Sequence, residues 1–189
     1  MSDLKDYSGE FRPDMKLSDF SKEALIQLVR AAAKCYGTQT SYWYTAAKEL
    51  YGAEVADKLQ ERVWLKGGAS EAELRNVCNA LKIEGHDIAS YFKYLQMTPI
   101  DATMMDLEFD LKDANHGTLT VKRCYSLSFW ERAGDRDLAL QKNICEVVDA
   151  RGFQLGGTWF NPRMKVTATK LPPRLNKKDV ACRWEFVIE

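Results

Sequence analysis

Apolar residues recur at helical spacing through the first half of the chain. The stretch "SKEALIQLVRAAAKCYG" places Leu25, Leu28, Val29 and Ala32 at helical spacing, and Gly37 marks a stop. The same spacing predicts four more helices, with the sequences "TSYWYTAAKELYG", "AEVADKLQERVWLKGG", "SEAELRNVCNALKIEG" and "HDIASYFKYLQMTP". Ser70 and Glu73 have the spacing of a capping box at the start of the fourth helix, and Pro99 ends the fifth.

The hydrophobic period changes in the second half. Strict alternation in "MDLEFDL" predicts a strand, and "TLTVKRCYSLSFWERAG" continues alternating, which places Arg123 on the apolar face and Cys124 on the opposite one. A helix, "DLALQKNICEVVDARG", follows, and Gly156 and Gly157 then allow a turn toward the next strand. Two more strands are expected in "RMKVTATK" and "ACRWEFVIE".

These elements predict an α+β fold. We expect an N-terminal helical subregion packed on an antiparallel sheet of about four strands with one intervening helix. Residues 1–17 form an N-terminal arm, residues 18–100 the helical subregion, and residues 101–189 the α+β subregion of one compact unit.

Charge and composition narrow the class of partner. The chain has 27 basic and 27 acidic residues, so no net field attracts nucleic acid. There is no apolar run of membrane-spanning length and no signal peptide, which predicts a cytoplasmic protein with no membrane partner. The basic stretch from Arg163 to Lys178 is either a solvated loop or a docking patch for an acidic partner.

Five widely spaced cysteines in such a chain are expected to be reduced. Without CxxC or paired histidines, the spacing predicts no metal and no cofactor. Cys124, Cys145 and Cys182 can nevertheless meet in space, because two lie on strands and one on a helix that packs against the sheet. Cys182 shares its face with Trp184 and Phe186, which favours a buried thiol.

Arginine and tryptophan side chains are the candidate ligand contacts. Arg123 on an apolar face needs a partner, either a structural ion pair or a ligand carboxylate or phosphate that its planar fork would hold. Trp43, Trp130 and Trp184 are candidates to wall a cavity between the helical half and the sheet. The expected ligand is therefore a small organic molecule, carboxylate-bearing or aromatic.

Two stretches carry a resemblance to a known family. The order Arg123-Cys124, Cys145 and "LPPRLNKKDVACRWEF" resembles the C-terminal signature of a family of uncharacterised prokaryotic proteins. The segment "YWYTAAKELYGAEVADKLQERVW" is similar to that family's helical half, and together the resemblance runs from about residue 17 to the end. Lys170 and Arg174 depart from the signature, which has a cysteine and an acidic residue there.

That family looks related to L-2-amino-thiazoline-4-carboxylic acid hydrolases and to 4-vinyl-reductase-type ligand-binding domains. The resemblance implies a small-molecule pocket and ring-opening hydrolysis. In that case Cys124 or Cys145 would be the nucleophile, Asp149 a proton carrier and Arg123 the carboxylate clamp. Three alternatives stay open: a binding module without catalysis, an accessory subunit that docks a larger enzyme, and a thiol-based metal or redox site. A homodimer and a protein partner are both compatible with the sequence.

Overall fold

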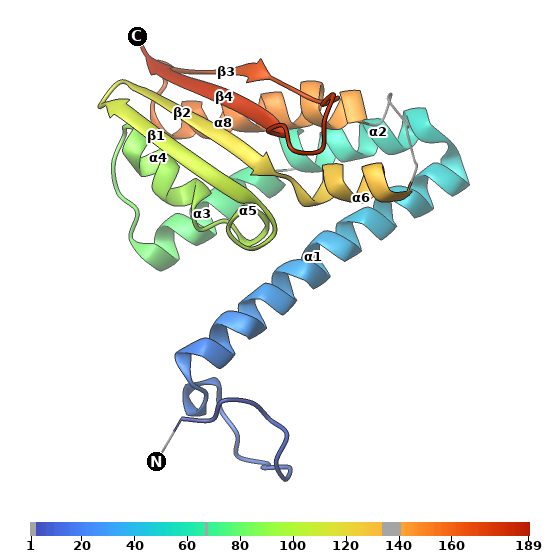
Figure 1. Ribbon diagram of the computed structural model, residues 1–189, viewed down its shortest axis with the longest axis vertical. Helices are drawn as coiled ribbons and strands as arrows, with labels where there is room; N and C mark the ends of the chain where they lie inside the picture. The colour runs from blue at the N-terminus through green and yellow to red at the C-terminus, as the bar shows by residue number, and fades with distance from the viewer. Residues whose placement is uncertain (1–2, 67, 134–140) are drawn as a thin grey trace.

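The protein combines a helical layer with one antiparallel sheet, which confirms the α+β prediction (Figure 1). The computed structural model describes residues 3–66, 68–133 and 141–189. The helices are α1 (Lys22–Tyr51), α2 (Ala53–Glu61), α3 (Ala69–Leu81), α4 (Ile88–Leu95), α5 (Pro99–Met104), α6 (Tyr125–Ala133) and α8 (Ala150–Phe160). A 3-10 turn η1 (Leu17–Asp19) precedes α1, and the π-helical segments η2 (Arg62–Lys66) and η3 (Asn143–Asp149) follow α2 and precede α8.

The sheet contains two hairpins that meet at their second strands. Its order is β1-β2-β4-β3, formed by β1 (Asp106–Asp113), β2 (His116–Arg123), β3 (Met164–Lys170) and β4 (Cys182–Ile188). Every neighbouring pair is antiparallel, as predicted. Leu119 pairs with Trp184 and Val121 with Cys182, so β2 and β4 form the centre of the sheet.

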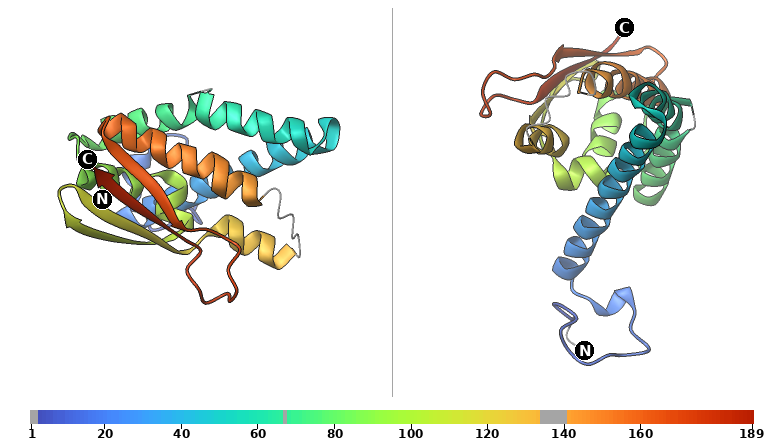
Figure 2. Two further views of the ribbon diagram at one scale, coloured as in Figure 1. Left: turned by 90° about the horizontal axis from the view of Figure 1, so that it is seen from above. Right: turned by 90° about the vertical axis from the view of Figure 1, so that its right-hand side faces the viewer.

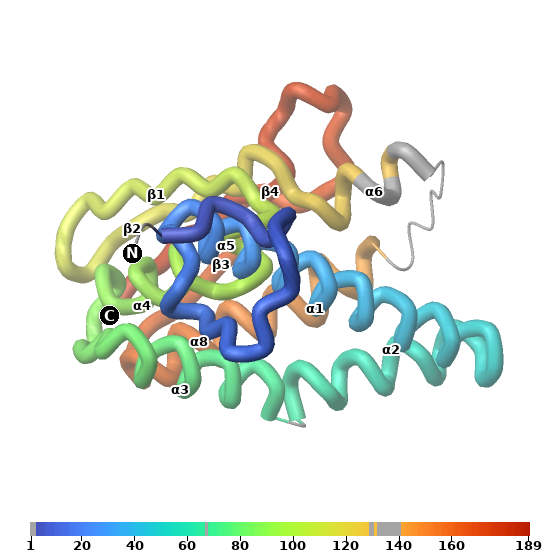
Figure 3. The backbone as a smooth tube through the Cα atoms, turned by 90° about the horizontal axis from the view of Figure 1, so that it is seen from below, coloured from blue at the N-terminus to red at the C-terminus, as the bar shows by residue number. Residues whose placement is uncertain are grey.

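The core lies between the inner face of the sheet and two helices, α4 and α8. The Tyr91 ring of α4 stacks on Phe160 of α8, with 5.2 Å between ring centroids. On β4, Trp184 lies 4.5 Å from the Phe153 ring, and Phe186 meets Phe92 edge to face. Seen from below, α2 and α3 run in line along the outer side of α8 (Figure 3). The alternation of β4 therefore places its aromatic side chains where the sequence predicted.

The first two predicted helices are one helix. α1 runs unbroken through Gly37, because an interior glycine costs a helix only about 1 kcal/mol and the apolar spacing continues past it. Gly37 faces α5, where an added Cβ would make an ordinary van der Waals contact with the Met104 sulfur at 3.6 Å. α1 has 30 residues, yet among the described residues no helix combines the length and apolarity needed to cross a membrane.

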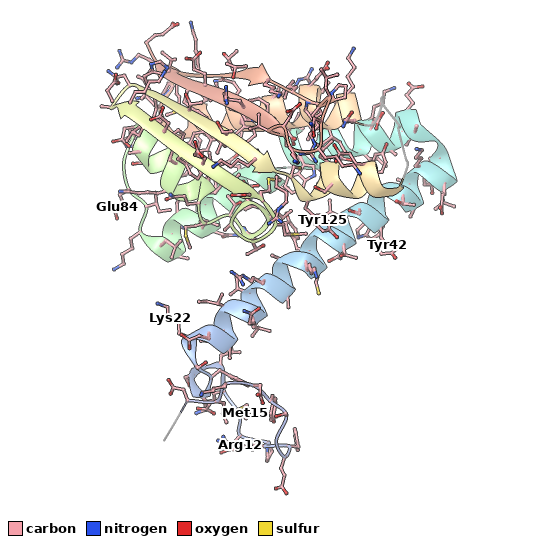
Figure 4. All side chains as sticks on the ribbon, in the orientation of Figure 1. Arg12, Met15, Lys22, Tyr42, Glu84 and Tyr125 are labelled. Carbon is pink, nitrogen blue, oxygen red and sulfur yellow. The ribbon has the colours of Figure 1, made fainter. Side chains whose placement is uncertain are left out.

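The N-terminal half of α1 projects from the rest of the molecule. Figure 2 shows this helix leaving the helical layer, with the N-terminal segment, residues 3–21, at its far end. Arg12 and Met15 lie in that segment, well away from the sheet (Figure 4). The segment is fastened to the start of α1 by a backbone bridge between Leu4 and Phe20.

The predicted capping box is wrong. α3 begins at Ala69, and its N-cap is Gly68, whose φ of 80° suits glycine. Glu73 instead turns inward and accepts hydrogen bonds from Tyr94 (3.2 Å) and Tyr36 (3.5 Å). Burial raises the pKa of this carboxyl, so the side chain serves the interior rather than the helix start.

The long second strand predicted from alternation is also wrong. β2 ends at Arg123, and the chain continues as α6 from Tyr125. Over a few residues, the apolar positions of "SLSFWE" fit both the two-residue period of a strand and the 3.6-residue period of a helix. The chain forms the helix, and Leu127 is buried there. Arg123 is consequently exposed at a strand end, not placed on the apolar face.

The glycine pair before β3 is helical, against the prediction of a turn. α8 extends to Phe160 and includes both Gly156 and Gly157. A Cβ on Gly157 would lie 2.8 Å from the Val166 side chain, so the glycine allows α8 to lie close against β3. A second difference is α5, which begins at Pro99 because proline suits the first turn of a helix.

Candidate functional site

Three thiols converge beneath one end of the sheet. Cys124 lies between β2 and α6, Cys145 on η3, and Cys182 at the first position of β4. The backbone amide of Ala181 donates to the Val121 carbonyl at 2.8 Å, which fixes the end of β4 beside the end of β2. The charges of Cys124 and Cys182 each raise the pKa of Cys145, so the three groups lie within electrostatic reach of one another.

All three thiols are held in their neutral form. Burial, as the main cause, raises the pKa of Cys124 to about 11 and that of Cys182 to about 12. Burial and the neighbouring Asp149 raise the pKa of Cys145 well above its ordinary value. The Trp184 indole N–H donates to the Cys182 sulfur at 3.3 Å, which favours the thiolate but is outweighed by burial.

Two carboxyl groups extend this cluster. Asp149 follows Cys145 by four residues, and burial together with the charge of Asp101 raises its pKa to about 7. Asp101, on α5, has a pKa of about 7 because of burial and, to a smaller extent, the charge of Glu73. The thiol–carboxyl cluster, as we call Cys124, Cys145, Cys182, Asp101 and Asp149, thus contains five acidic groups. The charges of its two carboxyl groups raise the pKa values of Cys124 and Cys182.

A buried arginine stands beside the cluster. Arg174, in the loop between β3 and β4, binds Glu131 of α6 with two hydrogen bonds of 2.7 Å, and its third nitrogen donates to the Asp179 carbonyl at 3.0 Å. Its side chain is only 6% exposed. The charge of Cys124 contributes to the raised pKa of Arg174, so the guanidinium lies near that thiol, but Glu131 already balances its charge.

The sequence analysis identifies neither Asp101 of the cluster nor the neighbouring Arg174 as a site residue. Arg174 stands out in the sequence only as a departure from the family signature. The one available signal was an arginine within the loop that precedes Cys182, because such a loop must fold back over the end of the sheet.

The other predicted ligand contacts are spread out. Trp184 is buried in the core, whereas Arg123 is exposed and Trp43 is 70% exposed on α1. The side chain of Trp130 lies outside the described residues. Of the predicted site residues, the structure therefore brings together the three cysteines, Asp149 and Trp184.

Two surface hollows lie away from the thiols. One, of about 660 Å³, follows the outward side of α8 and includes Arg151, Leu155 and Trp159. The other, of about 560 Å³, lies beside Arg163 and the C-terminal Glu189. Neither hollow is lined by a residue of the thiol–carboxyl cluster.

The cluster is not arranged around a metal ion in this structure. Within residues 3–66, 68–133 and 141–189, no group of three or more histidine, cysteine, aspartate or glutamate side chains has the spacing of a metal's ligands. Any ion bound by these thiols would therefore have to draw them closer together.

Comparison with known proteins places the chain among sequences without an assigned role. The model of a family of unknown function, DUF6125, matches residues 17–188. This confirms the expectation of an uncharacterised family and agrees with the extent of the resemblance. No curated protein matches the chain, and no solved structure does.

Proposed function

We propose that this chain, which belongs to the DUF6125 family of unknown function, binds a thiophilic divalent metal ion through Cys124, Cys145, Cys182 and Asp149. One observation carries the proposal: Cys124, Cys145, Cys182 and Asp149 lie close enough together, in a poorly solvated region, for the charges of the other three to raise the pKa of Cys145. The cation beside them, Arg174, is already paired with Glu131.

A bound cation would favour the ionised thiols and carboxylate, which burial and the neighbouring negative charges otherwise disfavour. Thiolates are soft ligands that favour ions such as Zn²⁺, and structural zinc sites use four ligands from cysteine, histidine and carboxylate. Three thiols and Asp149 supply such a set. Because Cys145 and Asp149 lie four residues apart on one helical segment, they can face the same ion, while Cys182 belongs to a central strand.

Trp184 would act in support of such a site. Its indole N–H already donates to the Cys182 sulfur, and a hydrogen bond of this kind strengthens when the acceptor becomes a thiolate. Donors around a metal site stabilise and orient the ligands in this way. The buried indole therefore favours a charged Cys182 once an ion is present.

Binding would be coupled to proton release. The ligands must lose their protons, and raised pKa values make that loss costly in the absence of the ion. The apparent affinity should therefore increase as the pH rises.

Titration of the purified full-length chain with Co²⁺ tests the proposal. We expect one equivalent per chain, thiolate-to-cobalt charge-transfer absorption, and displacement by Zn²⁺. Cys145→Ser should weaken binding by at least about 100-fold, since even a lost supporting contact costs 10- to 100-fold. Cys35→Ser is the matched control, because Cys35 is exposed on α1 and should leave binding unchanged.

Two results would contradict metal binding. One is a cobalt complex without thiolate absorption, and the other is an equal loss of affinity in both serine variants. Elemental analysis of the protein as purified gives an independent readout.

A second candidate is the hydrolase-type, small-molecule function that the resemblance to thiazoline-carboxylate hydrolases implies. Asp149 favours it, because a carboxyl with a pKa of about 7 can exchange protons near neutral pH. The raised pKa of Cys124 weighs against a thiolate nucleophile. Under this proposal Cys124→Ser or Cys145→Ser abolishes turnover of 2-amino-thiazoline-4-carboxylate and leaves the Tm nearly unchanged. Product formation unaffected by both variants would exclude these thiols.

The remaining sequence-based alternatives have their own signatures. A binding module without catalysis would gain thermal stability from a small carboxylate-bearing or aromatic ligand and release no product. An accessory subunit would form a complex of defined stoichiometry with a larger enzyme through its helical face or the basic loop.

A further inference from the structure

The chain exposes more surface than a compact protein of its mass. Its accessible area is 12449 Å², whereas a compact monomer of 21.6 kDa is expected to expose about 9,200 Å². The excess of roughly 3,200 Å² is several times the ~800 Å² that each partner buries in a standard interface. The projecting part of α1 and the N-terminal segment account for the extended shape (Figure 1).

The free side of α1 is apolar. In the projecting half of α1, successive positions at helical spacing present the half-buried Leu25 and the exposed Leu28, Val29 and Ala32 along one stripe, which we call the α1 stripe. Leu28 is 50% exposed and Val29 57% exposed. The stripe precedes the positions of α1 that pack on the rest of the molecule, namely the buried Ala33, Tyr36, whose hydroxyl donates to Glu73, and Gly37 beside Met104. The stripe is thus an exposed apolar surface on the projecting half of the helix.

The N-terminal segment adds to the same free surface. Its attachment to α1 is firm, because the Ser21 amide donates to the Leu4 carbonyl at 2.8 Å and the Tyr7 ring meets Phe20 edge to face. Yet Phe11 is 82% exposed, and Leu17 is also exposed. Exposed apolar side chains on an anchored segment are typical of a surface that another chain covers.

We propose that the α1 stripe, with the N-terminal segment, is the interface of a homodimer. A second copy fits because the stripe contains no charged residue that would select an oppositely charged partner, and because the net charge of zero lets two copies approach. Closed two-fold pairing is the commonest oligomeric arrangement, and it places the same patch on both copies. Pairing buries Leu28 and Val29 of each chain against the other stripe.

Sedimentation equilibrium of the full chain tests the proposal. We expect wild-type protein at micromolar concentration to have twice the 21.6 kDa mass of one chain. Leu28→Glu should lower this to the mass of one chain, with the helical circular dichroism retained. Gln27→Glu adds the same charge to an exposed neighbouring position outside the stripe, so it should remain dimeric. Val29→Lys provides a second interface variant.

A mixing experiment tests self-contact directly. If the stripe packs on its own copy, an equimolar mixture of Leu28→Glu and Leu28→Lys should recover the dimer mass, while each variant alone stays monomeric. A monomeric wild-type chain would overturn the proposal. So would a dimer that Leu28→Glu and Val29→Lys leave intact, because another surface would then form the contact.

Discussion

Gly156 of α8 lies directly against the Tyr91 ring of α4. A Cβ built on this glycine would be 2.7 Å from the ring carbon that bears the hydroxyl, and nearer still to the hydroxyl oxygen. The hydroxyl itself donates to the Phe153 carbonyl at 3.0 Å, within the same helix. The crossing of α4 and α8 therefore depends on the absence of a side chain at position 156.

Gly156→Ala is expected to destabilise the protein. The buried Tyr91 ring cannot move aside without losing its bond to Phe153, and overpacking of this kind costs about 1–3 kcal/mol. Gly152→Ala is the control, because it lies in the same helix and its Cβ would meet nothing within 4 Å. That change should be neutral or add up to about 1 kcal/mol. If Gly156→Ala and Gly152→Ala lower the free energy of unfolding in urea by the same amount, a clash with Tyr91 is not the cause.

The ion pair between Arg174 and Glu131 should contribute substantially to stability. Arg174→Ala removes the side chain that donates two hydrogen bonds to the partly buried Glu131 carboxylate, which should lower the free energy of unfolding by about 3 kcal/mol. Lys178→Ala, in the exposed part of the same loop, should change the free energy of unfolding by no more than about 0.5 kcal/mol. Denaturant titrations measure both, and a loss below about 1 kcal/mol in Arg174→Ala would contradict the expectation.

The pair also predicts a dependence on pH. Its hydrogen bonds to Arg174 lower the pKa of Glu131, so its contribution is present above the unfolded-state pKa and disappears as the pH falls through the folded-state pKa. The stability difference between wild type and Arg174→Ala should consequently narrow in acid. A difference that stays constant down to acidic pH would contradict a charged pair.

The raised pKa of Asp101 predicts the opposite pH dependence of stability. Its pKa is about 7 in the folded protein, against an ordinary value of 3.8, so between these values the folded state keeps a proton that the unfolded state releases. Stability must then decrease as the pH rises through this window. Asp101→Asn should flatten that decrease when unfolding is compared at about pH 5 and about pH 8. Asp110→Asn, an exposed carboxyl on β1, controls for the altered net charge, and an unchanged slope in Asp101→Asn would exclude Asp101 as its source.

The sequence predicted those parts of the fold in which one period persists over a whole element. β1, β3 and β4 alternate from end to end, and α4 keeps a single apolar face. The errors arose where local signals compete with tertiary packing. Gly37 was expected to end a helix and Gly156 to allow a turn, but both lie inside helices. Gly156 is the place where α4 and α8 approach closely, which is invisible without the partner helix.

The site was only partly predictable for a related reason. Cys182 and Trp184 share a face by simple alternation, so their burial followed from the strand. Which thiols lie close together depends on how the segments between β2 and β4 fold back onto the sheet. No local sequence pattern encodes the distances between thiols on different segments. Arg123 was misplaced because the alternation appeared to continue beyond the true end of β2.

The reactivity of the clustered thiols distinguishes a metal site from a nucleophilic one. With pKa values of about 11 and 12, Cys124 and Cys182 should alkylate at least about 100-fold more slowly near neutral pH than the same residues in the urea-unfolded chain, because only the thiolate reacts. Isotope-coded iodoacetamide with mass spectrometry measures each rate separately. Rates should rise with pH and fall further when Zn²⁺ is added. Rapid alkylation of Cys124 in the folded protein would instead reveal an activated thiolate, and would favour the hydrolase-type function over metal binding.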